Sequence, residues 1–147
     1  MPFFFNQNVA YVEVSRGCTK KPACSFCANS TRHGLPWRLL NIPQVLRNIC
    51  EIAQHKPIAI NFVSEDFLGN SDNSMLSFLN QLEHLRSKGV IDKMISFYCA
   101  VKVTDIYSLK DSETVNQAKK IKLKRMKSLG FNTLYVGFES GSNQQLQ

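Results

Sequence analysis

The feature that most constrains the fold is a regular alternation of strand-like and helix-like segments along the chain. Four short runs rich in β-branched and aromatic residues predict strands, and amphipathic stretches separate them. The expected strands cover residues 9–14, 58–63, 94–103 and 133–138. The expected helices begin near Pro43, Asn73 and Glu113 and end just before Pro57, Gly89 and Gly130. Strands joined by helices in this order predict an α/β fold with a parallel sheet and right-handed crossovers.

Polar segments whose side chains can bind metals or accept hydrogen bonds follow three of these expected strands. The first strand leads into a loop with three cysteines, the second into Ser64-Glu65-Asp66, and the fourth into Glu139-Ser140-Gly141-Ser142. Parallel α/β folds bind their ligands at the carboxyl ends of the strands. The sequence therefore predicts that the three segments meet at one rim of the sheet and form a binding site there.

The loop after the first strand carries Cys18, Cys24 and Cys27 within a span of ten residues. Two residues separate Cys24 from Cys27, which lets two thiolates point the same way from one tight turn. Three thiols with no fourth beside them predict a metal or cluster site with one coordination position left open. The alternatives are a structural zinc site with His33 as fourth ligand and a simple electron-transfer cluster. Residues 28–41 show no clear period and are expected to form a loop.

Length and cysteine content add broad limits. At 147 residues the chain is expected to form one domain at most, and no run is long enough to cross a membrane, so no membrane partner is expected. Five cysteines are an odd number, which argues against a disulfide framework. The lack of a targeting signal implies a cytoplasmic protein whose thiols stay reduced. Cys50 and Cys99 are expected to be small buried hydrophobes.

The net charge has two interpretations. The chain carries a formal charge of +7, and cations crowd the third expected helix. These cations are Lys119, Lys120, Lys122, Lys124, Arg125 and Lys127. They fit a solvated outer face of the helix, or a face that binds an anionic partner such as RNA. Charge alone does not separate the two.

The cysteine loop resembles the cluster loop of radical S-adenosylmethionine (SAM) enzymes, through Ser15-Arg16-Gly17-Cys18 and Cys24-Ser25-Phe26-Cys27. The likeness is strongest to the branches related to methylthiotransferases and cobalamin-dependent proteins. The family usually has three residues between the first two cysteines, whereas this chain has five. The resemblance implies a partial parallel (β/α) barrel with about four of the family's six βα units. Residues 1–147 are then expected to be the N-terminal portion of a truncated radical SAM core domain.

The resemblance also implies a set of cofactor contacts. The implied ligands of a 4Fe–4S cluster are Cys18, Cys24 and Cys27. The implied SAM contacts are Phe26 near the adenine, Ser64 and Glu65 near the amino group, and Glu139 and Ser140 near the ribose hydroxyls. Two glycines that precede the family's glutamate are replaced here by Val63 and Ser64, and Asp66 is an alternative acceptor for the amino group. An acidic helix cap is the competing interpretation of the Glu65-Asp66 pair.

The activity implied by the resemblance is the reductive cleavage of SAM to a deoxyadenosyl radical, which abstracts a hydrogen atom from an unknown substrate. An electron donor such as flavodoxin or ferredoxin is expected as a partner, and cobalamin as a possible cofactor of the full-length protein. The competing hypothesis is a non-catalytic zinc or iron–sulfur module with a basic RNA-binding face. Lys102 is expected at the rim as a substrate contact, and Trp37 and Phe67 either cover the site or anchor loops.

Overall fold

The computed structural model describes residues 8–20, 24, 26–27, 36–69 and 73–137. Its main feature is a four-stranded sheet in which every neighbouring pair of strands is parallel. The strands, in spatial order, are β1 (Val9–Val12), β4 (Ala59–Phe62), β5 (Ser96–Val101) and β6 (Phe131–Val136). Each crossover adds the next strand beside the previous one, which is the order of a βα barrel and not of a doubly wound sheet. The predicted α/β class with a partial parallel barrel is confirmed.

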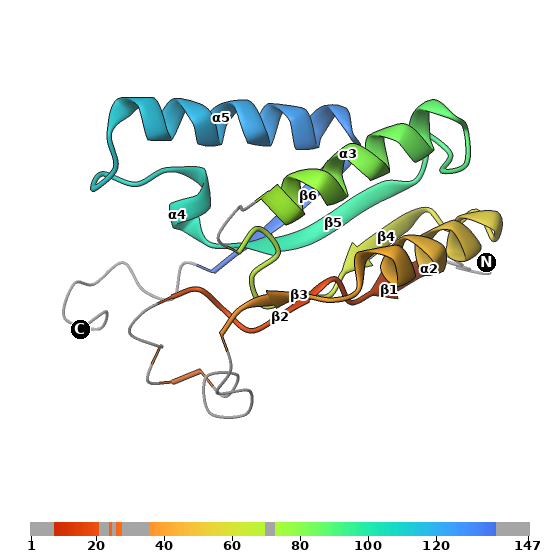
Figure 1. Cartoon of the computed structure of the whole chain (residues 1–147), viewed down its shortest axis with the longest axis horizontal. Helices are drawn as coiled ribbons and strands as arrows, with labels where there is room; N and C mark the ends of the chain where they lie inside the picture. The colour runs from red at the N-terminus through yellow and green to blue at the C-terminus, as the bar shows by residue number, and fades with distance from the viewer. Residues whose placement is uncertain (1–7, 21–23, 25, 28–35, 70–72, 138–147) are drawn as a thin grey trace, which may run out of the picture.

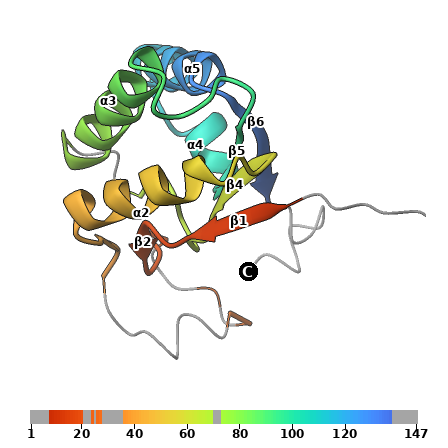
Figure 2. The same cartoon turned by 90° about the vertical axis from the view of Figure 1, so that its right-hand side faces the viewer.

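Three long helices cover one face of this sheet: α2 (Ile42–Gln54), α3 (Asn73–Ser87) and α5 (Glu113–Ser128). Figure 2 places all three on the same side of the curved strands. The Asn41 side chain begins α2 by accepting a hydrogen bond from the Gln44 amide (3.0 Å), and Ser112 caps α5 in the same way. The three expected helices are therefore confirmed. No helix in the described ranges is long and apolar enough to cross a bilayer.

Five phenylalanine rings form the centre of the core between the sheet and the helices. They come from three strands, from α3 and from the segment after β4: Phe62, Phe67, Phe78, Phe97 and Phe131. Neighbouring ring centroids lie 5.2–6.4 Å apart in stacked, tilted and edge-on arrangements. Phe67 is fully buried in this cluster, so it anchors the segment after β4. Of the two roles predicted for Phe67, the structure supports the anchor.

The other face of the sheet carries polar and aromatic side chains in cross-strand register. Asn61 of β4 lies between Tyr11 of β1 and Tyr98 of β5. Thr133 of β6 continues this row beside Tyr98, and residues paired in this way point to the same face. Tyr11 is 67% exposed, and the rings of Tyr98 and Tyr135 meet edge-on with centroids 6.5 Å apart. Among the described residues, the long helices all lie on the opposite side of the sheet (Figure 2).

Two kinds of element were not expected from the sequence. Ser15–Arg16 (β2) and Arg38–Leu39 (β3) pair antiparallel, although the sequence predicts only a loop over residues 28–41. A short helix, α4 (Val103–Ile106), follows β5 directly. Two-residue strands and a one-turn helix contain too few residues to show a hydrophobic period. Only the folded chain reveals them.

Three of the parallel strands, β1, β4 and β5, are shorter than the apolar runs that predict them, and β6 is shifted along the chain. β1 ends at Val12, and two residues later the Val14 carbonyl accepts a hydrogen bond from the Leu40 amide (2.9 Å) at the base of the β2–β3 pair. β6 begins at Phe131, two residues before the expected start, across an irregularity in its register with β5. Its expected last residue, Phe138, lies outside the described residues.

A buried arginine fastens the end of the sheet where β5 and β6 begin. Arg86 of α3 is 8% exposed, and its guanidinium donates to the carbonyls of Lys93 (3.1 Å) and Ile95. Its charge also lies 4.4 Å from the centroid of the Phe97 ring. Gly130, just before β6, has φ +92, and a Cβ there would lie 2.6 Å from an Arg86 nitrogen. A side chain at this position therefore needs both a left-handed backbone and a shift of the Arg86 guanidinium.

We expect Gly130→Ala to destabilise the fold more than Gly89→Ala does. Both glycines have positive φ, but the space around Gly89 is open. The left-handed backbone costs an alanine about 1–2 kcal/mol at either position. Gly130→Ala also displaces Arg86 from its carbonyl partners, which adds about 1–3 kcal/mol. Urea denaturation of both variants measures the difference in the free energy of unfolding, and equal losses would mean that Arg86 moves aside at no cost.

Candidate functional site

The cysteine loop leaves the sheet and returns to it through the β2–β3 ribbon. Ser15 pairs with Leu39, and the Leu40 amide donates to the Val14 carbonyl at the base of the loop. The two limbs are therefore tied together before the loop begins, which limits the chain entropy of the cysteine-bearing segment. Figure 1 shows the ribbon beside the sheet, near the end of β4.

Three consecutive side chains after β4 bind the backbone of residues 15–19, which form the outgoing limb of the cysteine loop. The hydrogen bonds are Ser15 N–H to Ser64 Oγ (3.1 Å), Gly17 N–H to Glu65 Oε2 (3.1 Å) and Thr19 N–H to Asp66 Oδ2 (3.2 Å). Alternate amides of the limb, at residues 15, 17 and 19, thus donate in order to the side chains of residues 64, 65 and 66. These side chains take the place of a neighbouring strand. The predicted meeting of the first and second rim segments is confirmed.

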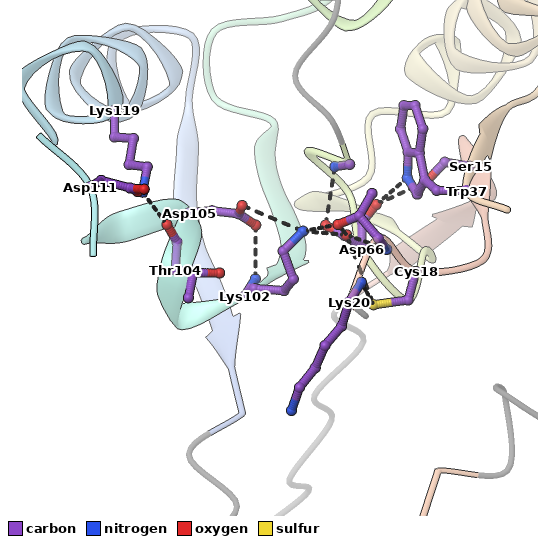
Figure 3. A network of polar contacts seen from close by, with 12 residues as sticks. Ser15, Cys18, Lys20, Trp37, Asp66, Lys102, Thr104, Asp105, Asp111 and Lys119 are labelled. Carbon is purple, nitrogen blue, oxygen red and sulfur yellow. Dashed lines mark hydrogen bonds and ion pairs between the residues drawn. The ribbon is translucent and has the colours of Figure 1, made fainter. Parts of the chain in front are cut away.

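Asp66 makes the largest number of these contacts and is completely buried. Its Oδ2 accepts from the Thr19 hydroxyl (2.6 Å) and pairs with Lys102 Nζ (2.5 Å), while Oδ1 accepts from the Gly69 amide (3.1 Å) (Figure 3). Burial by itself raises the pKa of Asp66, but the Lys102 and Thr19 hydrogen bonds and the Lys102 charge bring it below its ordinary value. The carboxylate is therefore ionised at neutral pH, and its charge is compensated.

Trp37 lies on the returning limb of the loop, just before β3, and contacts the same segment after β4. Its indole N–H donates to the Asp66 carbonyl (2.7 Å), which also accepts from the Ser15 hydroxyl (3.2 Å). Gly69 has φ +53, and a Cβ there would lie 2.0 Å from the Trp37 ring. Only glycine leaves room for the indole at this position. Trp37 is therefore an anchor of the loop, one of the two roles that its sequence position allows.

Lys102 follows β5 and lies between two carboxylates. Its Nζ contacts Asp66 and the Thr19 hydroxyl, and it is 3.6 Å from Asp105 Oδ1. The Lys102 amide donates to Asp105 Oδ2 (3.0 Å) at the start of α4. Burial raises the pKa of Asp105, the Lys102 charge lowers it, and the nearby Asp66 charge adds to the rise. The rim position predicted for Lys102 is confirmed, and its ammonium is engaged by protein groups.

The three predicted cluster ligands lie on different parts of the loop. Cys18 ends the held limb and is exposed, with its Sγ 3.9 Å from Asp66 Oδ2 and 3.4 Å from the Lys20 amide. Cys24 and Cys27 are half-buried and share a turn in which the Cys27 amide donates to the Cys24 carbonyl (3.1 Å). This turn has the tight geometry that the two-residue spacing predicts.

The donor set fits a cluster in kind and number, because one loop supplies three thiols. Within the described residues, no three His, Cys, Asp or Glu side chains lie close enough together to hold a metal ion. The ligand roles of Cys18, Cys24 and Cys27 therefore stay predictions. The alternative zinc ligand His33 lies outside the described residues.

The predicted SAM contacts have different surroundings. Phe26 is 64% exposed beside Cys27. Ser64 and Glu65 each give an oxygen to the backbone of the outgoing limb, as described above. The last two contacts, Glu139 and Ser140, lie outside the described residues. None of these contacts is tested by the structure, and each stays a prediction.

The other two cysteines, Cys50 and Cys99, are free thiols like the three of the loop. Cys99 is fully buried, and burial raises the pKa of its thiol to about 12. Cys50 in α2 is half-buried, and burial followed by the charge of Glu51 raises the pKa of its thiol. The expectation of a buried hydrophobe is confirmed for Cys99 and holds only in part for Cys50.

Part of the basic charge on α5 is used inside the fold. Lys119 pairs with Asp111, and Arg125 pairs with Glu83 of α3 (2.5 Å). Other lysines of this helix, Lys120, Lys124 and Lys127, line an open groove of about 560 Å³ between α4 and α5. The solvated-face interpretation fits this arrangement, and RNA binding stays untested.

The sequence analysis missed the central position of Asp66 and its contacts with Thr19 and Lys102. A Ser-Glu-Asp run after a buried strand signals a rim segment. Nothing in the run shows which of Glu65 and Asp66 is buried. Lys102 is separated from Asp66 by 36 residues, so only the parallel alignment of β4 with β5 brings them together.

A parallel βα sheet with a three-cysteine loop after its first strand is the arrangement of the radical SAM class. The fold and the loop therefore agree with the resemblance to this class that the sequence predicts. No family model matches the chain.

Individual relatives agree with this class. The chain is 30% identical to 4'-phospho-dehydrooxetanocin synthase of Priestia megaterium, over 92% of this chain and 18% of that protein. It is also similar to the cobalamin-dependent SAM radical enzyme OxsB with aqua-cobalamin bound, with a TM-score of 0.73, 26% identity, and coverage of 92% of this chain and 19% of OxsB. A structure of OxsB with aqua-cobalamin and SAM gives a TM-score of 0.72 at 25% identity, over 95% of this chain and 20% of OxsB. The resemblance to cobalamin-dependent radical SAM proteins is confirmed, and the chain spans about a fifth of the length of these relatives.

We expect Gly69→Ala to move the Trp37 indole away from Asp66. The added methyl group occupies the position of the ring, so the hydrogen bond to the Asp66 carbonyl is lost. Trp37 is the single tryptophan of the chain, so its fluorescence reports on this junction alone. The emission maximum should shift to the red in Gly69→Ala. Gly89→Ala, which also places a side chain at positive φ but in open space, should leave the emission unchanged.

Proposed function

We propose that this chain forms part of the core of a cobalamin-dependent radical SAM enzyme. Such an enzyme cleaves SAM reductively at a 4Fe–4S cluster and uses the deoxyadenosyl radical to abstract a hydrogen atom from its substrate. The observation that carries the proposal is the three-cysteine loop fastened to the rim of a sheet that is similar to OxsB in sequence and fold. The enzymatic character is inferred from relatives of the same class.

The residues of this chain position the proposed cluster. Cys18, Cys24 and Cys27 would hold it, and the bound cluster would supply the electron for SAM cleavage. Residues 64–66 fix the limb that carries Cys18, and Trp37 joins the returning limb to the same segment. The protein thereby lowers the entropy that the loop would lose when it closes around an inorganic core.

The SAM contacts follow from the same arrangement. The exposed ring of Phe26 offers an apolar surface beside Cys27 on which an adenine can stack. The Glu65 carboxylate, at the end of β4, suits an ammonium group such as that of SAM, and Ser64 lies beside it. Glu139 and Ser140 are proposed for the ribose hydroxyls on the family resemblance alone.

The longer protein is proposed to bind cobalamin, because two solved structures of OxsB contain aqua-cobalamin and one of these also SAM. An electron donor such as flavodoxin or ferredoxin is proposed to reduce the cluster in the cytoplasm. The proposal stops at the reaction class, since the rim residues described here do not identify a substrate.

Anaerobic reconstitution of the protein with iron and sulfide should give about four irons and four sulfides per chain. Cys24→Ala removes one of three proposed ligands, so its iron content should fall to a small fraction of this value. Cys50→Ala is the matched control, because it removes a half-buried thiol of α2. One zinc and no sulfide per chain would support the non-catalytic module instead.

The full-length protein with a strong reductant should convert SAM to deoxyadenosine and methionine, and Glu65→Gln should weaken SAM binding. Loss of a hydrogen bond between charged groups is expected to raise the dissociation constant by about 10–100-fold. Equilibrium dialysis with labelled SAM measures this constant. The control Glu113→Gln alters an exposed glutamate at the start of α5 and should bind like the parent. An unchanged constant for Glu65→Gln would remove Glu65 from the site.

A further inference from the structure

Two arginine side chains bury a guanidinium nitrogen that finds no hydrogen-bond partner in the part of the chain that the structure describes. These atoms are Nη1 of Arg38 and Nε of Arg86. Buried polar atoms are nearly always hydrogen-bonded, so each exception calls for an explanation. The fold explains Arg86, because its other two nitrogens donate to carbonyl oxygens just before β5 and its charge lies 4.4 Å from the centroid of the Phe97 ring. The buried nitrogen of Arg38 has no such explanation.

Arg38 lies on β3, on the face of the β2–β3 ribbon that is turned away from the core. It stands opposite Arg16 of β2, and the next pair of the ribbon is Ser15 with Leu39. Ser15 is fully buried, and Leu39 packs against the core. Successive residues of a strand point to opposite faces, so the two arginines share the other face. The ribbon follows β1 along the chain (Figure 1), which places this face near the carboxyl ends of the parallel strands, where α/β folds bind ligands.

The charge of Arg16 is compensated within the ribbon. Its Nε and Nη2 donate to the two carboxylate oxygens of Glu13, at 2.6 Å and 2.7 Å. Both oxygens of Glu13 are thus engaged by a single guanidinium. Like charges directly opposite each other on paired strands repel, and arginine stays protonated in proteins. The ribbon therefore neutralises one of its two facing cations and leaves the buried Nη1 of the other without a described partner.

We propose that Arg38 binds an oxyanion, the phosphoryl or carboxylate group of a small ligand, on this face of the ribbon. A guanidinium presents parallel N–H donors in a planar fork, which matches two oxygens of either group. Such a group would satisfy the buried Nη1 and compensate the charge at the same time. The inference stands on the geometry of the ribbon and does not require the loop cysteines to hold a cluster.

The partial burial of Arg38 suits an anion better than it suits water. The side chain is half-buried, so one part of it can be approached from solvent while Nη1 is shielded. A water molecule would accept one hydrogen bond but would leave the charge uncompensated in a site of reduced polarity. Attraction between opposite charges is stronger in such a site than at an exposed surface. An anion is therefore the partner that this environment favours.

The test uses the full-length protein without added iron and two probes that share one ring, phenyl phosphate and benzoate. Titrations at constant ionic strength, followed by NMR signals of the probes, give the two dissociation constants. The parent should bind at least one probe saturably, and Arg38→Met should raise that constant by about 10-fold or more, because a charge-assisted contact is lost. Tighter binding of phenyl phosphate assigns a phosphoryl ligand, and tighter binding of benzoate assigns a carboxylate ligand.

Arg47→Met is the matched control for the loss of an arginine. Arg47 is exposed on α2 and donates to Gln44 Oε1 (2.6 Å), so its loss removes the same charge from outside the ribbon. It should bind both probes like the parent. Arg38→Lys keeps the charge but not the fork, and its dissociation constant should lie between those of the parent and Arg38→Met. A constant equal to that of the parent would overturn the bidentate contact.

Thermal unfolding separates an anion site from a purely structural arginine. Without a probe, Arg38→Met should unfold at the same temperature as the parent or higher, because it removes a buried charge without a described partner. The probe that binds should raise the unfolding temperature of the parent and not that of the variant. A variant that unfolds earlier in all conditions overturns the inference, and so does a parent that binds neither probe. Both results leave the proposed function standing, because the iron content is measured separately.

Discussion

The buried carboxylate of Asp66 is the interaction on which the site depends. It accepts from the loop through Thr19, from the segment after β4 through Gly69, and from the end of β5 through Lys102. A buried charge is tolerated only where hydrogen bonds and an opposite charge surround it, and all of them are present here. Three parts of the chain that are distant in sequence are thereby joined at the carboxyl rim of the sheet.

The rest of the fold serves to bring these parts together. The phenylalanine core buries Phe67, one residue after Asp66, and so sets the direction of the segment after β4. The parallel pairing of β4 with β5 brings Lys102 to the same rim. On the opposite face, the row that contains Tyr11 and Tyr98 is not covered by the long helices.

Local signals in the sequence were sufficient for much of the fold. The three long helices follow from their amphipathic period and from the Pro43, Gly89 and Gly130 signals at their ends. The β2–β3 ribbon was not foreseeable, because two residues show no period and their pairing depends on the return of a distant limb. For the site, the sequence pointed to Cys18, Cys24 and Cys27 and to the segment after β4. It could not show that Ser64 and Glu65 hold the backbone of the cysteine loop.

The sequence by itself determined the parallel α/β class and the spacing of the three cysteines, because hydrophobic period and ligand spacing are properties of neighbouring residues. The tertiary structure decided which of two adjacent acids is buried. Glu65 and Asp66 have similar chemistry, but burial of Phe67 and the position of β5 give Asp66 the lysine partner. A partner 36 residues away is chosen by strand alignment, which no local pattern encodes.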